Sequence, residues 1–219
     1  MSNTYIIVPV YNGEQYIESF LAQIDDKWRK KLIFVNDGSG DKSEEILNEK
    51  NVIVINHELN KGKGAAIKSA SQWVKNHGGD SVITIDIDLQ HPLELLSKFS
   101  HIPKETIVLG YRNDRKSMPV LRKFSNFMTS LLISVRTGTV IKDSQCGYRA
   151  FNMDIFNRVS CEENGFHYES EFLIKSSLIG WKINHINIPT IYENQPSAMN
   201  HFSDTMKFIK LWFKSFLWT

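Results

Sequence analysis

Short apolar runs rich in β-branched residues alternate with segments of helical length along this chain, and no other feature constrains its fold as strongly. Such runs predict buried strands, and the longer segments between them predict helices. This order implies one α/β domain in which a mainly parallel sheet lies between helices. The predicted strands span 5–10, 32–35, 52–55, 81–85, 106–110 and 182–188, and the predicted helices span 14–24, 41–48, 64–77, 119–136 and 168–179.

Polar side chains gather where four of the predicted strands end. In a parallel sheet the carboxyl ends of the strands share one edge, and ligands bind in the crevice beyond that edge. We therefore expect the functional site there. The clusters are Asn12-Gly13, Asp37-Gly38-Ser39, Asp86-Ile87-Asp88 and Tyr111-Arg112.

The segment ITIDIDLQHP, at positions 83–92, places three oxygen-bearing side chains directly after a predicted strand. If the backbone stays extended, Asp86, Asp88 and Gln90 point in one direction, because side chains alternate along a strand. Their oxygens suit a hard divalent cation such as Mg²⁺ or Mn²⁺. The segment therefore suggests a metal site, and a polar turn after a core strand is the alternative.

Two other strand ends could hold a nucleoside. Tyr11, which follows Pro9, could stack near a base, and Asp37 could accept a hydrogen bond from an N–H of uracil or guanine. Both residues stand in common turn sequences, so turn formation is the alternative for each.

The segment NKGKGAA, at positions 60–66, has glycines and two lysines before a predicted helix, as a phosphate-binding loop would. Lys63 is its candidate ligand. The segment is not a P-loop, because the G-x-x-x-x-G-K-[ST] spacing is absent. The alternative is a helix start at which glycine allows close packing.

Positions 143–149, DSQCGYR, combine a carboxylate, a glycine and an arginine in a segment without a helical pattern. Asp143 could take a proton from an acceptor hydroxyl, and Arg149 could bind a phosphate through two N–H groups. A local Asp–Arg ion pair that holds a turn is the alternative. Cys146 has no obvious activating His nearby, and we expect a small buried thiol.

Basic residues concentrate in one stretch of a nearly neutral chain whose formal charge is +2. Positions 103–142 contain eight Lys and Arg against Glu105 and Asp114, a local charge of about +6. Such a stretch suggests an anionic ligand or a membrane surface, with a solvated helix face as the alternative. We expect no nucleic-acid partner.

The tail at positions 203–219 predicts an amphipathic helix that follows a domain at 1–202. Lys207, Lys210 and Lys214 share one face, and aromatic and aliphatic side chains fill most of the rest. A helix of this kind can lie in a bilayer interface. Packing on the core, or on a partner chain in a homodimer, is the alternative.

The sequence has two cysteines, no signal-peptide pattern and no apolar run of about 18 residues. We therefore expect a reducing, cytoplasmic location, with peripheral contact to the inner face of the membrane left open.

Six motifs, taken in this order, resemble those of one enzyme family. They are VPVYNG (8–13), VNDGSGD (35–41), NKGKGAA (60–66), DIDLQHP (86–92), GYR (110–112) and DSQCGYRAF (143–151). The family is the inverting family 2 glycosyltransferases, and the likeness is closest to the dolichyl-phosphate mannose synthase and polyprenyl-phosphate branch. It covers about residues 4–205; the segment 188–193, with Ser197, His201 and Phe202, matches more loosely.

The resemblance implies a GT-A fold and a nucleotide-sugar donor, either a UDP-sugar or a GDP-sugar. A divalent cation, Mg²⁺ or Mn²⁺, would be held against the donor diphosphate. By likeness the nucleotide contacts are Pro9, Tyr11, Glu14, Asp37, Lys63 and Asp86, and the metal ligands are Asp86, Asp88 and Gln90.

The resemblance also implies direct displacement with inversion at the anomeric carbon. A phosphate acceptor is already an anionic nucleophile, whereas a hydroxyl acceptor would need a base, for which Asp143 is the candidate. Asp88 is the other expected catalytic residue. The arginines that would bind the phosphate of a polyprenyl acceptor are Arg112, Arg122 and Arg149.

Some features depart from the family pattern or leave alternatives. Asn36 stands where many relatives have Asp, and the segment IYENQPSAMNHF lacks the Arg and Ser-Lys pattern of the dolichyl mannose branch.

A hydroxyl of a glycan or polysaccharide is the alternative acceptor. A nucleotidyltransferase would need a Gly-rich loop after the first strand, which is absent, and the three site carboxylates argue against a non-catalytic protein. Glu169 and Glu171 could border the acceptor pocket, although a solvated face is favoured.

Overall fold

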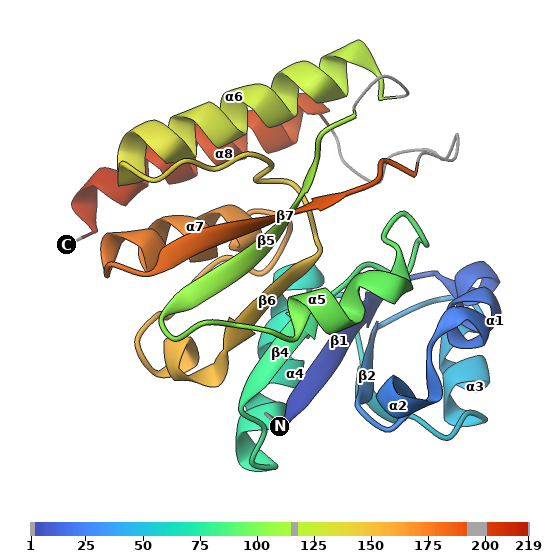
Figure 1. Cartoon of the computed structure of the whole chain (residues 1–219). Coiled ribbons are helices and arrows are strands. Elements are labelled where there is room, and N and C mark those ends of the chain that lie inside the picture. The colour runs from blue at the N-terminus through green and yellow to red at the C-terminus, as the bar shows by residue number, and fades with distance from the viewer. Residues whose placement is uncertain (1–2, 115–117, 192–200, 219) are drawn as a thin grey trace.

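A seven-stranded sheet in the order β3-β2-β1-β4-β6-β5-β7 forms the centre of the molecule (Figure 1). The computed structural model describes residues 3–114, 118–191 and 201–218; Arg115, Lys116, Ser197 and the side chains of His201 and Phe202 lie outside the described residues. The strands are β1 Thr4–Val10, β2 Leu32–Asp37, β3 Ile53–His57, β4 Ser81–Thr84, β5 Thr106–Arg112, β6 Arg149–Asn152 and β7 Lys182–Ile188.

The sheet is mainly parallel, as predicted, and one strand reverses. The β1–β2, β2–β3, β1–β4 and β5–β7 pairs are parallel, whereas β6 runs antiparallel to both β4 and β5. The sequence did not predict β6, because its four residues follow a polar segment and carry no periodic signal of their own. Thr84 pairs with Arg149, so the chain that leaves β4 runs beside the chain that enters β6.

Helices lie in front of and behind the sheet (Figure 1), which explains why the central strands are apolar on both faces. Each helix predicted before residue 180 is present, with ends shifted by at most two residues. Helices α2 and α5 and the three 3₁₀ turns are too short for sequence periodicity to detect. The helices are α1 Glu14–Gln23, α2 Asp26–Arg29, α3 Ser43–Asn48, α4 Lys63–Asn76, α5 Leu96–Phe99, α6 Val120–Thr137, α7 Tyr168–Leu178 and α8 His201–Lys214, and the 3₁₀ turns are Leu93–Leu95, Met153–Asn157 and Ser215–Leu217.

Helix α8 packs on the protein, in line with one of the two alternatives for the tail. Its Phe208 and Leu211 side chains are buried, at 4% and 3% exposure. The indole Nε1 of Trp212 donates to the carbonyl of Leu132 in α6 at 2.8 Å, and α8 lies along α6 in Figure 1. Lys214 forms an ion pair with Glu162 at 2.6 Å, so the lysine face of α8 is partly used inside the chain.

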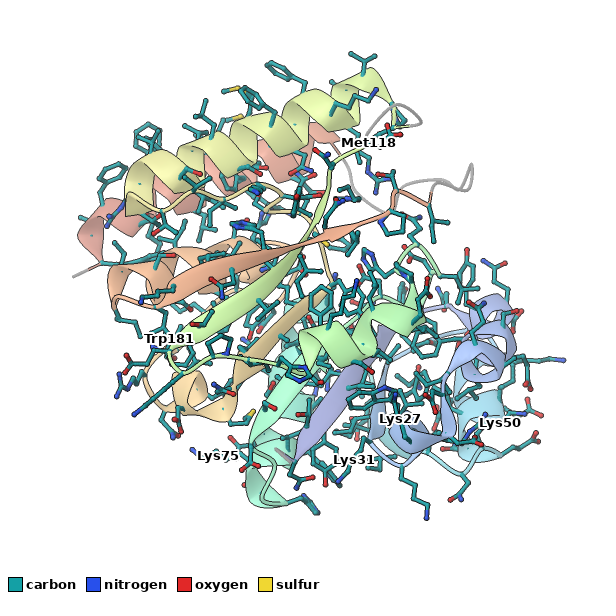
Figure 2. All side chains as sticks on the ribbon, viewed as in Figure 1. Lys27, Lys31, Lys50, Lys75, Met118 and Trp181 are labelled. Atoms are coloured by element: carbon teal, nitrogen blue, oxygen red, sulfur yellow. The ribbon has the colours of Figure 1, made fainter. Side chains whose placement is uncertain are left out.

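Helix α6 turns an apolar face away from the sheet (Figure 2). Its buried residues, Asn126, Ser130 and Ile133, lie on the opposite side. No helix within the described residues is both long and apolar enough to cross a bilayer. We call the exposed face the α6 ridge; its residues, between 43% and 80% exposed, are Val120, Leu121, Phe124, Phe127, Leu131 and Val135.

Two leucines near the C-terminus test the packing of α8. Replacing Leu211 with Ala removes a buried side chain and should lower the free energy of unfolding by about 2–5 kcal/mol. Leu217→Ala is the matched control, because Leu217 is 81% exposed, and it should leave stability nearly unchanged. Urea denaturation followed by tryptophan fluorescence measures both. Equal effects of the two substitutions would show that α8 is not docked as described.

Candidate active site

The segment that carries Asp86 and Asp88, here called the DxD turn, follows β4 as a turn and does not continue the strand, so the condition of an extended backbone is not met. The strand ends at Thr84, and Leu89 adopts a left-handed conformation with φ +60°. Asp88 Oδ1 accepts a hydrogen bond from the backbone N–H of Gln90 at 3.0 Å, an arrangement that stabilises such turns. Asp86 and Asp88 therefore owe their positions to a turn.

Asp86 is the centre of a charged cluster. Its Oδ1 lies 2.6 Å from Lys63 Nζ, and its Oδ2 lies 3.6 Å from Nε2 of the buried His91. Lys63 also reaches Oε1 of Glu169 at 3.1 Å. Burial alone would raise the pKa of Asp86, but the charge of Lys63 and the contact with His91 hold it well below its ordinary value. Asp86 is therefore a carboxylate anion at neutral pH.

Asp88 is affected differently by the same environment. Burial raises its pKa, and the negative charge of Asp86 raises it further. Two neighbouring carboxylates that repel each other fit a hard divalent cation, which would relieve that repulsion. No group of three or more His, Cys, Asp or Glu side chains within the described ranges could hold a metal ion alone. A cation here would take its remaining ligands from a diphosphate and from water.

Gly147 brings the segment 143–149 against the DxD turn. A Cβ atom at Gly147 would overlap the carboxylate of Asp86, so only glycine allows this approach. The Gly147 carbonyl also accepts a hydrogen bond from Thr84 Oγ1 at 2.9 Å. Two motifs that lie about sixty residues apart in the sequence thus meet at the sheet edge.

Asp143 is fully buried and is held by the end of β5 and by α6. Its Oδ2 accepts from Arg112 Nε at 2.8 Å, and its Oδ1 accepts from Arg112 Nη2 at 3.0 Å and from Asn126 Nδ2 at 2.7 Å. Burial alone would lower the pKa of Arg112, but its bonds to Asp143 hold that pKa above its ordinary value. The ion pair of Asp143 is therefore made with Arg112 at the end of β5, and not with Arg149 inside the segment, as the alternative of a local ion pair required.

Arg149 does not offer the expected phosphate contact. The residue is 2% exposed, and its guanidinium group donates to three backbone carbonyls, those of Cys146, Ser144 and Glu169, at 2.7–2.9 Å. This arginine fixes the segment instead of binding a ligand. Arg122, the third predicted arginine, lies half-buried in the first turn of α6.

Cys146 is a buried thiol, as predicted. It is 0% exposed, and burial together with the charge of Asp143 raises the pKa of Cys146 to about 12. The thiol therefore stays protonated at neutral pH and is a poor nucleophile.

The loop before α4 uses its glycines for packing, as the alternative interpretation expected. A Cβ atom at Gly64 would overlap Tyr168, and one at Gly62 would overlap the carbonyl of Asn164. The backbone N–H of Ala65 donates to that carbonyl at 3.0 Å. The side chain of Lys63 contacts Asp86 and Glu169 at the site.

Asp37 has three partners inside the protein. Its carboxylate accepts from the backbone N–H groups of Lys61 and Gly62 at 3.0 and 2.7 Å, and it lies 2.6 Å from His57 Nδ1. It is 3% exposed. Asp37 therefore holds the loop that carries Lys63, and a contact to a nucleotide base stays a prediction.

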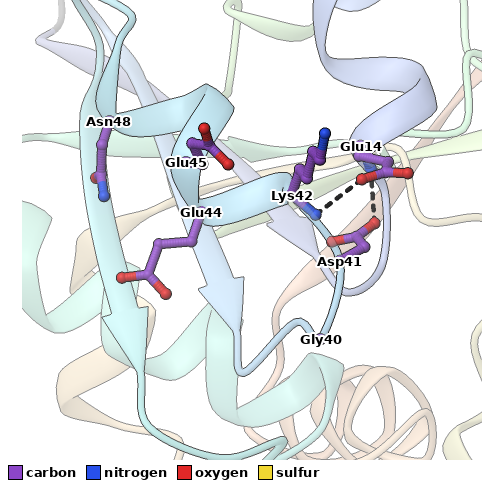
Figure 3. Close-up of a pocket in the computed structure, with 7 residues that line it drawn as sticks. All are labelled: Glu14, Gly40, Asp41, Lys42, Glu44, Glu45 and Asn48. Atoms are coloured by element: carbon purple, nitrogen blue, oxygen red, sulfur yellow. Dashed lines mark hydrogen bonds between the residues drawn. The ribbon is translucent and has the colours of Figure 1, made fainter.

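The end of β1 is tied to the loop after β2. Glu14 Oε2 accepts from the Lys42 N–H at 2.8 Å, and the Glu14 N–H donates to Asp41 Oδ2 at 3.0 Å (Figure 3). Pro9 is half-buried and Tyr11 is 54% exposed, so the tyrosine ring is open to a ligand. Glu14 also borders a cavity of about 580 Å³, which is lined by Glu14, Gly40, Asp41, Lys42, Glu44, Glu45 and Asn48.

Four carboxylates around this cavity would repel a diphosphate, so the cavity does not suit the donor phosphates. The positive charge of Lys63 lies instead at the DxD turn.

Glu169 is a site residue that sequence reasoning placed on a solvated face. It is 7% exposed and contacts Lys63. Helix α7 contacts both α4 and α6, and most of its residues are buried, so it has no broad polar face. The burial of this helix could have been inferred from its small residues, which allow close helix packing: Ser170, Ser176 and Ser177.

Comparison with known proteins identifies the class to which this site belongs. The model of glycosyl transferase family 2 matches residues 5–164. The chain belongs to this family and is a glycosyltransferase, which confirms the family and the GT-A fold expected from the motifs.

Similar proteins share most of the chain. It is 30% identical to a UDP-N-acetylglucosamine–dolichyl-phosphate N-acetylglucosaminyltransferase of Methanococcus voltae, over 89% of this chain and 88% of that one. It is also 30% identical to a dolichyl-phosphate hexose transferase of Haloferax volcanii, over 84% and 81% of the two chains. The structure of glucosyl-3-phosphoglycerate synthase from Mycobacterium tuberculosis with UDP shares the fold, with a TM-score of 0.71 at 19% identity over 98% of this chain and 80% of that chain.

Gly147→Ala tests the contact between the two motifs. The added methyl group displaces the carboxylate of Asp86, and we expect sugar transfer to slow by roughly tenfold to a hundredfold, because small misplacements at a reacting centre are costly. Gly165→Ala is the control, since a Cβ there meets no atom within 4 Å. Initial rates with the native donor measure the effect, and circular dichroism checks the fold. A Gly147→Ala enzyme of native activity would contradict the described approach.

Proposed function

We propose that this glycosyltransferase moves a sugar, with inversion, from a UDP- or GDP-sugar to a polyprenyl phosphate. The burial of Asp143 is the observation that supports this acceptor most directly. A base for an acceptor hydroxyl needs an accessible carboxylate, and Asp143 is 0% exposed and bonded to Arg112 through both oxygens. A phosphate acceptor needs no base, because it is already ionised. The relatives named for dolichyl-phosphate transfer support the same acceptor.

The donor would lie along the ends of β1, β2 and β4. Tyr11 and Pro9, with Glu14 and Asp37 behind them, are the proposed nucleoside contacts. Asp86 and Asp88, with Gln90, are the proposed ligands of Mg²⁺ or Mn²⁺, and a bound cation supplies Lewis-acid stabilisation of the leaving diphosphate. Lys63 adds a fixed positive charge at the same end of the donor.

The proposed reaction is a single displacement. An oxygen of the acceptor phosphate forms a bond to the anomeric carbon while the bond from that carbon to the donor diphosphate breaks. The electron pair leaves with the nucleoside diphosphate, and the configuration inverts. Arg112 and Arg122 orient the acceptor phosphate, and Asp143 positions Arg112.

The acceptor is tested by transfer of radiolabelled sugar to a short polyprenyl phosphate. We expect label in the organic extract with the phosphate and none with the corresponding alcohol. Replacing Arg122 with Gln should raise the KM for the acceptor by roughly tenfold, because a charge-assisted contact is lost, and leave the KM for the donor unchanged. Arg158→Gln, at an exposed pair with Glu105, is the control. Label found only on a water-soluble glycan would contradict this acceptor.

We also propose that the α6 ridge contacts the inner face of the membrane. Contiguous exposed apolar side chains mark interaction surfaces. Arg122 and Lys123 lie in the first turn of α6, and Lys207 and Lys210 are exposed on α8, which packs against α6. Apolar side chains flanked by lysine and arginine suit an anionic bilayer surface.

Vesicle flotation with and without anionic phospholipid tests this contact. The double substitution Phe124→Ser and Phe127→Ser removes two exposed rings and should weaken binding to anionic vesicles at least tenfold, since each ring would be buried in the interface. Leu59→Ser is the control, because Leu59 is 75% exposed outside the ridge. Unchanged flotation would contradict the membrane contact. If the native chain is a dimer and the double substitution makes it dissociate, the ridge is instead an interface with a second copy.

A further inference from the structure

Lys63 lies between two carboxylates from different parts of the chain. Its Nζ is 2.6 Å from Asp86 Oδ1 and 3.1 Å from Glu169 Oε1. One ammonium group is therefore shared by two carboxylates.

Glu169 is fixed in place independently of Lys63. Its backbone carbonyl accepts from Arg149 Nη1 at 2.8 Å, and its Oε1 lies 3.8 Å from Arg149 Nε. It also lies in the first turn of α7, where the helix dipole favours a carboxylate. Glu169 thus presents a stationary negative charge to the end of a flexible lysine side chain.

A divalent cation at Asp86 would compete with Lys63 for the same carboxylate. Two cations on one half-buried carboxylate repel each other, and solvent screens that repulsion less than it would at the open surface. A second carboxylate within reach of the lysine removes this conflict.

We propose that Glu169 is a positioning residue that retains the Lys63 ammonium group when Asp86 binds a divalent cation. Lysine and cation can then bind the donor diphosphate together. The inference rests on the proposed metal site at Asp86 and Asp88. It gives Glu169 a role through Lys63, without direct contact to the metal.

Titration of the full-length protein with Mn²⁺ alone, with free Mn²⁺ measured by electron paramagnetic resonance, tests this role. In Glu169→Gln, Asp86 is the remaining carboxylate at the Lys63 ammonium group, so Lys63 competes with Mn²⁺ for it. We expect this substitution to weaken Mn²⁺ binding roughly tenfold or more. Glu169→Asp, which keeps the charge, should lose less. In a Lys63→Met background the same Glu169→Gln change should have no effect, because no lysine competes for Asp86.

Glu162→Gln is the matched control, since Glu162 forms an exposed ion pair with Lys214 and should leave Mn²⁺ binding unchanged. Native affinity in Glu169→Gln would overturn the inference. An equal loss in the Lys63→Met background would also overturn it, because Glu169 would then act without the lysine. Absence of Mn²⁺ binding by the folded native chain would contradict the proposed metal site, and the inference with it. Thermal unfolding of each variant verifies the fold.

Discussion

The candidate active site lies at one edge of the sheet, and its geometry depends on the antiparallel pairing of β6 between β4 and β5. Because Thr84 pairs with Arg149, the chain that leaves β4 and the chain that enters β6 continue side by side past the sheet. Asp86 can then lie against Gly147, and Asp143 can meet Arg112 at the end of β5. A parallel strand in this position would place residues 143–148 at the opposite edge, because its N-terminal flank would lie there. The reversal of one short strand thus brings the two motifs together.

The charged side chains at this edge of the sheet are paired with side chains of opposite charge. Asp143 is matched by Arg112, and Asp86 and Glu169 share Lys63. Burying an ion is costly unless a partner and hydrogen bonds compensate it, and removing one member leaves the other charge unpaired. The side chains of each group therefore act as a unit, and the effect of one substitution includes the reorganisation of its partners. Gly147 and Gly64 make this arrangement possible at the backbone, because the lack of a side chain at each lets a charged segment approach closely.

Sequence periodicity predicted the long elements and the edge where the site lies, because strands and helices bury residues at characteristic spacings. It could not predict β6, whose four residues are ordered by neighbours distant in sequence. The motif at 143–149 suggested that Arg149 binds a phosphate, but three backbone carbonyls occupy that guanidinium group, and no local pattern signals such contacts. Leu89 breaks the extended geometry assumed for Asp88 and Gln90. Glu169 was misjudged because its helix is enclosed on most sides by tertiary packing.

The first turns of α6 join the charged and apolar parts of the proposed acceptor site. Asn126 of α6 donates to Asp143, which in turn holds Arg112, so the start of the helix lies beside that arginine. Arg122 lies one turn before Asn126, and the α6 ridge begins at Val120 and runs along the outer face. A lipid phosphate needs this combination, because its charged group must reach the arginines while its hydrocarbon chain stays in an apolar phase. A soluble glycan would use neither the ridge nor an ionised nucleophile, and it would require an accessible base that Asp143 does not provide.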